Sequence, residues 1–202
     1  MTPQRIARIL LIVALAAAGL ALAETEPPAG PPPAPDPSGR WTSAMGELTL
    51  ALAGDALSFT YTAVFGASAH ICDGAGVAGL VTDGRYEYID EQGTITFLVT
   101  VQGIRMETAD GIASFCGADW PGDTFSRDKF QPLAPCRVTA KKAYFHVVGP
   151  LPPERRRGYV LRGDAVAMAP ALHAGDEWVL GRFRSAKGTT AGLLRRQDLA
   201  CP

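Results

Sequence analysis

The sequence predicts an all-β protein, and three observations lead to this class. Segments of four to eight residues in which apolar and small or polar side chains alternate recur from residue 47 to residue 194. Turn residues such as Gly54-Asp55 separate these segments. No stretch of residues 39–136 has a helical period, so closed or sandwiched antiparallel sheets are expected.

The first 23 residues read as a secretory signal peptide. Arg5 and Arg8 precede an apolar run over residues 9–20, and Ala21-Leu22-Ala23 forms a small-residue cleavage site. An uncleaved anchor is the alternative, although the run is shorter than the roughly 20 apolar residues that cross a bilayer. We therefore expect a periplasmic or secreted protein with no membrane span after signal cleavage.

Residues 24–38 form a Pro-rich linker that contains seven prolines. Such a composition buries little apolar surface and favours an extended backbone, which predicts a semi-rigid spacer. The alternative is a ligand for a proline-recognising partner.

Two modules follow the linker, with a boundary near Cys136. The strands predicted in the first module, residues 39–136, are 47–52, 57–64, 86–89, 94–101 and 104–108. The strands predicted in the second module, residues 137–202, are 143–148, 158–161, 165–168, 177–180 and 190–194.

The two modules carry opposite charge. Residues 40–136 hold 5 Lys and Arg against 12 Asp and Glu, and residues 137–202 hold 12 against 5. An acidic module attracts basic partners and a basic module attracts anionic ones. The two modules packing together, or pairing head-to-tail between molecules, is the competing explanation.

The four cysteines form an even set in an exported chain, which predicts two disulfides. Three connectivities are open, and Cys72–Cys116 with Cys136–Cys201 is favoured because each pair then lies within one module. The group His70, Cys72 and Asp73 offers metal ligands, but no second close Cys/His pair accompanies it, so no metal site is predicted.

Two clusters are candidates for partner binding. Asp119, Trp120 and Asp123 place an aromatic between carboxylates on a Gly/Pro turn, suited to a basic partner. The alternative is a structural loop with Trp120 packed against the barrel mouth. Arg155-Arg156-Arg157 follows a Pro-rich stretch and is expected in a loop that binds anionic polymers, or else as a solvated face.

The second module resembles bacterial SH3-like domains. The residues that carry the resemblance are Ala143-Tyr-Phe-His146, Gly158-Tyr-Val-Leu-Arg-Gly-Asp164, Glu177-Trp178-Val179, and Gly192-Leu193-Leu194 with Asp198-Leu199. Leu193 stands where family members have Trp. The resemblance implies a small β-barrel that associates with the cell envelope.

The first module is similar to the calyx-like antiparallel β-barrel of lysozyme-inhibitor-type periplasmic proteins. The similarity rests on Ser68-Ala-His-Ile-Cys-Asp73 with Gly76-Val-Ala78, and on Ser114-Phe-Cys-Gly-Ala118 with Gly122-Asp-Thr-Phe125. It implies a binding barrel more directly than an inhibitor.

These expectations combine into an exported, non-enzymatic binding protein of the cell envelope. The acidic barrel would bind or inhibit a basic lysozyme-type wall hydrolase. One alternative is an envelope scaffold whose SH3-like domain binds cell-wall peptide, peptidoglycan or another anionic envelope polymer. Another is an uncharacterised envelope hydrolase, although no Gly-x-Ser-x-Gly, His-Glu-x-x-His or phosphate-binding motif occurs. No cofactor and no nucleic acid partner are predicted, and the oligomeric state is left open.

Overall fold

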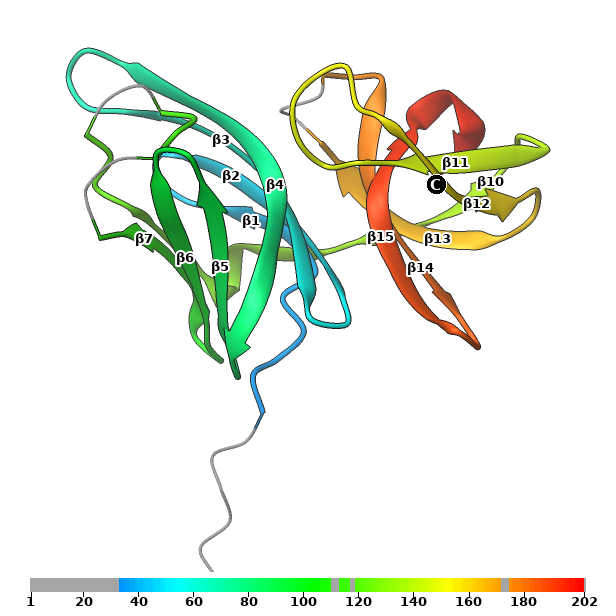
Figure 1. The fold of residues 1–202 in the computed structure, drawn as a ribbon, viewed down its shortest axis with the longest axis horizontal. Coiled ribbons are helices and arrows are strands. Elements are labelled where there is room, and N and C mark those ends of the chain that lie inside the picture. Colours follow the sequence, from blue (N-terminus) through cyan, green and yellow to red (C-terminus); the bar gives the residue numbers. More distant parts are fainter. Residues whose placement is uncertain (1–32, 110–112, 117–118, 172–174, 202) are drawn as a thin grey trace, which may run out of the picture. The chain divides into compact units, whose positions relative to one another are not determined.

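The computed structural model describes residues 33–109, 113–116, 119–171 and 175–201. The expected signal peptide, the first part of the Pro-rich linker and the turn at Asp110-Gly111 lie outside these residues, as do Gly117 and Ala118. The described chain is all-β, and its strands form two antiparallel sheets (Figure 1).

The first sheet has nine strands in the order β8-β7-β6-β5-β4-β3-β2-β1-β9 and is nearly closed into a barrel. Its strands are β1 (Gly39–Thr42), β2 (Gly46–Ala53), β3 (Ala56–Phe65), β4 (His70–Thr82), β5 (Arg85–Asp90), β6 (Gly93–Val99), β7 (Gly103–Thr108), β8 (Asp123–Ser126) and β9 (Phe130–Pro132). Ser43, in the turn after β1, donates a 2.9 Å hydrogen bond to the Asp123 carboxylate on β8, which links the two sides of the opening.

Four strands of the barrel are not revealed by the sequence pattern: β1, β8, β9 and the longest strand, β4. Strand β4 shows the reason most clearly. It holds three glycines, and two of them, Gly74 and Gly76, face inward where large rings need the space. A Cβ at Gly74 would lie 2.2 Å from the Phe115 ring, and one at Gly76 would lie 2.5 Å from the Tyr88 ring. Because these glycines have no side chains, the alternation of apolar and polar residues that predicts a strand is missing from β4.

The second sheet has seven strands in the order β12-β11-β15-β14-β13-β10-β16 and forms a half-barrel. Its strands are β10 (Ala134–Val138), β11 (Lys142–His146), β12 (Arg155–Leu161), β13 (Ala165–Pro170), β14 (Trp178–Ser185), β15 (Gly188–Arg195) and β16 (Leu199–Ala200). The change of sheet falls at Leu133, a few residues before the expected module boundary. Arg155, Arg156 and Arg157 open strand β12, so their predicted place in a loop is wrong.

Both predicted disulfides are present. Cys72 bonds to Cys116 across 44 positions, and Cys136 bonds to Cys201 across 65. The first bond fastens the segment before β8 to strand β4, and the second fastens the end of the chain to β10. The bonds indicate an oxidising extracellular or periplasmic environment.

Small side chains on the outer face of the barrel contact the half-barrel. Ala51 and Ala75 join an apolar cluster with Trp178, Leu180 and Leu193 of the second sheet. Their neighbours Thr49, Ser58 and Thr60 are 2%, 4% and 2% exposed, although their alternation with apolar residues predicts a solvated face. These small side chains are buried because the second sheet packs over this face of the barrel.

The end of the Pro-rich segment is attached to both sheets. Pro37 accepts a 2.9 Å hydrogen bond from the Trp41 indole nitrogen of the barrel. The Asp36 carboxylate accepts a 2.6 Å bond from Arg182 Nη1 and a 3.2 Å bond from Arg184 Nη2, both on β14. Ser38 Oγ lies 2.6 Å from the same Arg182 nitrogen. Residues 36–38 therefore connect the barrel to the half-barrel.

We expect the Asp36–Arg182 pair to make stability fall in acid. Partial burial opposes ionisation, but hydrogen bonds from Ser38 and Arg182 outweigh it and lower the pKa of Asp36. The contribution is therefore complete above the unfolded pKa of about 3.9 and is lost as the pH falls through the folded value. The Asp36 side chain is 42% exposed, and solvent screening limits the effect to about 1 kcal/mol. Urea unfolding of Asp36→Asn between pH 2 and 7 checks this, since the variant must lose stability at neutral pH and not in acid.

Candidate functional site

One face of the half-barrel gathers aromatic rings and cationic side chains. The side chains of strand β12 point alternately to the two faces of the sheet. Val160 lies in the half-barrel core, so Tyr159 and the residues two and four positions before it lie on the opposite face. On the adjacent strand β11, Ala143 and Phe145 are in the core, which leaves Lys142, Tyr144 and His146 on the same opposite face.

The contacts on this face alternate between ring and cation. Tyr144 and Tyr159 pair directly across β11 and β12, with ring centroids 5.6 Å apart. The Lys142 ammonium lies 4.2 Å from the Tyr159 ring centre, and the Arg155 guanidinium lies 4.8 Å from that of Tyr144. Each cation is held over a ring while remaining open to solvent.

The pattern continues across strands β15 and β14. His146 pairs with Leu193, so the same antiparallel register places Arg195 opposite Tyr144. Arg195 in turn pairs with Trp178, and its guanidinium lies 5.2 Å from that ring. The residues that run across four strands form what we call the aromatic–cation row: Tyr159, Tyr144, Arg195 and Trp178, flanked by Lys142, Arg155 and His146.

His146 is held in one orientation inside this row. Its Nδ1 lies 3.0 Å from the Tyr144 carbonyl oxygen, to which the Nδ1 proton is donated, and its ring packs 4.6 Å from Trp178. Burial, together with the positive charges of Arg195 and Arg155, lowers the pKa of His146. The imidazole is therefore neutral at pH 7, and the charge of the row comes from its arginines and lysine.

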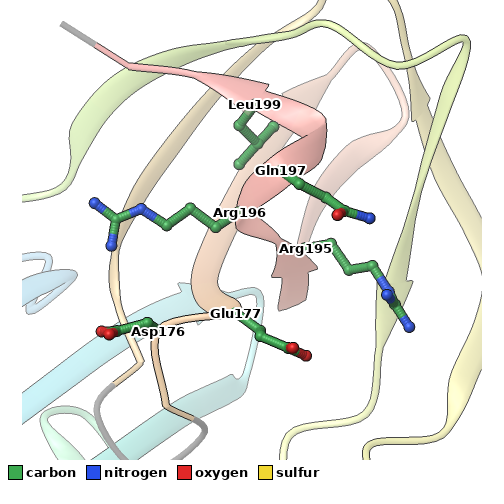
Figure 2. A pocket seen from close by; sticks show the side chains of 6 residues that line it. All are labelled: Asp176, Glu177, Arg195, Arg196, Gln197 and Leu199. Carbon is green, nitrogen blue, oxygen red and sulfur yellow. The ribbon is translucent and has the colours of Figure 1, made fainter.

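A cavity of about 480 Å³ adjoins the row at Arg195. Figure 2 shows its lining side chains, with Arg195 and Gln197 extending to one side of the chain and Arg196 to the other. Asp176 and Glu177 lie across from them, on the segment that leads into β14. Side chains of both charges line the cavity, so a ligand on the row would meet both donors and acceptors at this end.

The three consecutive arginines of the basic run have different surroundings. Arg155 belongs to the aromatic–cation row, and Arg157 is exposed on the same strand. Arg156 donates a 2.8 Å hydrogen bond from Nη1 to the Ala191 carbonyl of β15. The sequence signal for this site lay in the alternation of Lys142 with Tyr144, which places a cation and a ring on one face.

Two of the three candidate residues in the Asp119–Asp123 segment are buried. Asp119 is exposed, whereas Trp120 is 2% exposed with its ring edge-on to Tyr61 at 5.9 Å. Asp123 is 6% exposed, and its Oδ2 accepts 2.9 Å hydrogen bonds from Ser43 Oγ and the Tyr61 hydroxyl. Burial raises the pKa of Asp123 despite these bonds. This geometry favours the structural interpretation for Trp120 and Asp123, and partner binding through the segment stays a prediction.

Cys72 cannot act as a metal ligand together with His70 and Asp73, because its sulfur is bonded to Cys116 in a disulfide. Across residues 33–109, 113–116, 119–171 and 175–201, no three His, Cys, Asp or Glu side chains gather closely enough to hold a metal ion.

Comparison with known proteins finds no matching family model, no matching curated protein and no matching solved structure. The resemblances to SH3-like domains and to lysozyme-inhibitor-type barrels therefore stay predictions. Within the described part of the chain, no helix has the length and apolar character needed to span a membrane. The fold defines a disulfide-bonded all-β protein with a barrel and a half-barrel.

Proposed function

We propose that this protein is an exported, non-enzymatic binding protein of the cell envelope, and that its aromatic–cation row binds an anionic envelope polymer. The observation that carries the proposal is the register of the row, which sets rings and guanidinium groups side by side on one sheet face. This face is exposed at Tyr159, Arg155 and Arg195, and it is buried at Trp178, where the first sheet covers it. The net positive charge of residues 137–202 attracts such a polymer from a distance.

The chemistry of the row suits a polymer that has both rings and charge. Tyr159 is 45% exposed and offers a flat surface on which a sugar ring can stack. The Arg155 and Arg195 guanidinium groups can bind carboxylate or phosphate through paired N–H donors. An anionic glycan such as peptidoglycan supplies both groups.

The test is a sedimentation assay of the mature protein with purified peptidoglycan at low and physiological salt. We expect Arg195→Gln and Tyr144→Ala each to weaken binding by about ten-fold, the effect of losing roughly 1.4 kcal/mol, with a smaller salt dependence for Arg195→Gln. Lys187→Gln removes the same charge from an exposed turn outside the row and serves as the control. If Lys187→Gln weakens binding as much as Arg195→Gln, general charge and not the row is responsible.

A basic lysozyme-type wall hydrolase is the second candidate partner, and it would bind the acidic barrel. The observation that favours it is the excess of acidic residues over positions 40–136, with Asp119 exposed at the barrel mouth. Asp119→Asn should slow association with lysozyme at low salt and leave dissociation nearly unchanged. An unchanged association rate in stopped-flow mixing removes Asp119 from this interaction.

A further inference from the structure

The barrel has an open cavity at its mouth that the aromatic–cation row does not involve. Its volume is about 490 Å³, within the size range of small-molecule sites. Three separate stretches of chain line it: the turn before β2, the turn between β3 and β4, and the segment that precedes β8. The disulfide Cys72–Cys116 fastens this last segment to β4.

The walls of the cavity are largely apolar and fixed. Phe65 and Trp120 both line it, and they are 8% and 2% exposed. Met45 and Pro121 extend the same apolar surface. The Trp120 ring lies edge-on to Tyr61, with ring centroids 5.9 Å apart, which holds it in the wall.

Three polar residues, Ser68, His70 and Asp119, also line the cavity. Ser68 Oγ and His70 Nε2 are 3.1 Å apart, joined through Ala69, whose φ of 53° lies in the left-handed region that alanine rarely adopts. The Ala69 N–H donates a 3.2 Å hydrogen bond to the Gly66 carbonyl, which closes the turn. Asp119 contributes an exposed carboxylate. Backbone strain of this kind often occurs where side chains are positioned for binding.

We propose that this cavity binds a small organic cation with an apolar body, of the amidinium or guanidinium class. The apolar wall formed by Met45, Phe65 and Pro121 would contact the apolar body, and the Asp119 carboxylate would pair with the planar cation. Ser68 would supply a further hydrogen bond. The site is independent of the polymer-binding proposal, because it shares no residue with the aromatic–cation row.

The test uses benzamidine, benzamide and benzoate, which share one ring and differ in charge. Titrations are followed through the indole N–H signals of the ¹⁵N-labelled mature protein, with Trp120 assigned by Trp120→Phe. We expect benzamidine to shift the Trp120 signal saturably, benzamide to bind about five-fold more weakly, and benzoate to bind least. Asp119→Asn should bring benzamidine to the affinity of benzamide, and Asp128→Asn, on an exposed residue outside the cavity, should change nothing.

Three outcomes would overturn the proposal. The first is equal binding of the three probes, which would leave no role for the carboxylate. The second is a shift confined to the Trp41 or Trp178 signals. The third is a Trp120 signal that does not respond to benzamidine in the folded parent protein. Trp120 is buried, so Trp120→Phe is expected to lose stability. Ser68→Ala provides a second variant that alters the rim of the cavity and leaves its walls intact.

Discussion

Replacing Gly74 by alanine is expected to destabilise the protein by about 3 kcal/mol, at the upper end for overpacking a core. A Cβ at this position would lie 2.2 Å from Cγ of Phe115, close to the backbone of that residue. Phe115 cannot retreat easily, because the next residue, Cys116, is bonded to Cys72 on the same strand as Gly74. Overpacking must therefore move the backbone of the segment or of β4.

Gly79→Ala on the same strand is the matched control. A Cβ at Gly79 meets no atom within 4 Å, and its φ is outside the left-handed region. Alanine there restricts the unfolded chain without a clash, so the variant should be as stable as the parent or up to about 1 kcal/mol more stable. Urea denaturation of both variants measures the difference. Equal losses at Gly74 and Gly79 would mean that strand propensity, and not the Phe115 contact, limits the substitution.

The glycines of β4 explain why the sequence predicts some strands of the barrel and not this one. Strands β2, β3, β5, β6 and β7 alternate apolar and polar residues because one side of each fills the barrel, and all five were predicted. Strand β4 pairs with the whole of β3 from His70 to Gly79, yet it leaves the filling of the interior to rings from Tyr88 and Phe115. An absence of side chains carries no periodic signal, so the longest strand was missed.

The contact between the sheets could not be predicted for a related reason. Thr49, Ser58 and Thr60 have side chains that suit a solvated strand face and equally a closely packed one. Thr49 Oγ1 donates a 3.2 Å hydrogen bond to the Pro170 carbonyl of the half-barrel, which satisfies its hydroxyl there. Alternation reports which residues share a face and not what covers that face.

The candidate sites show the same limit. Charge counting indicated a basic second module, and Arg155 does lie in the aromatic–cation row. The partners Tyr144 and Trp178 are on other strands, and only the register of β11 and β15 brings them into one row. In the barrel, Asp123 has the sequence context of an exposed loop carboxylate, but the near-closure of the sheet buries it against Tyr61.

Removing the Cys72–Cys116 bond with the double variant Cys72→Ala/Cys116→Ala should cost roughly 4 kcal/mol, because the bond closes a loop of several tens of residues. Both sulfurs are buried, so alanine also leaves a small cavity at the barrel mouth. Removing Cys136–Cys201 should have a similar effect on unfolding, since the loop it closes is of comparable length. Guanidinium denaturation under non-reducing conditions measures both losses.

The disulfide and Gly74 should not act independently. Without the bond to β4, the segment that carries Phe115 can move away from an added Cβ, so Gly74→Ala should cost less in the Cys72→Ala/Cys116→Ala background than in the parent. A coupling free energy of about 1 kcal/mol or more is expected for groups in contact. Strict additivity would show that Phe115 is held over Gly74 by the packing of the barrel itself. In that case the cavity at the mouth keeps its shape in the reduced protein, and binding of benzamidine should survive reduction.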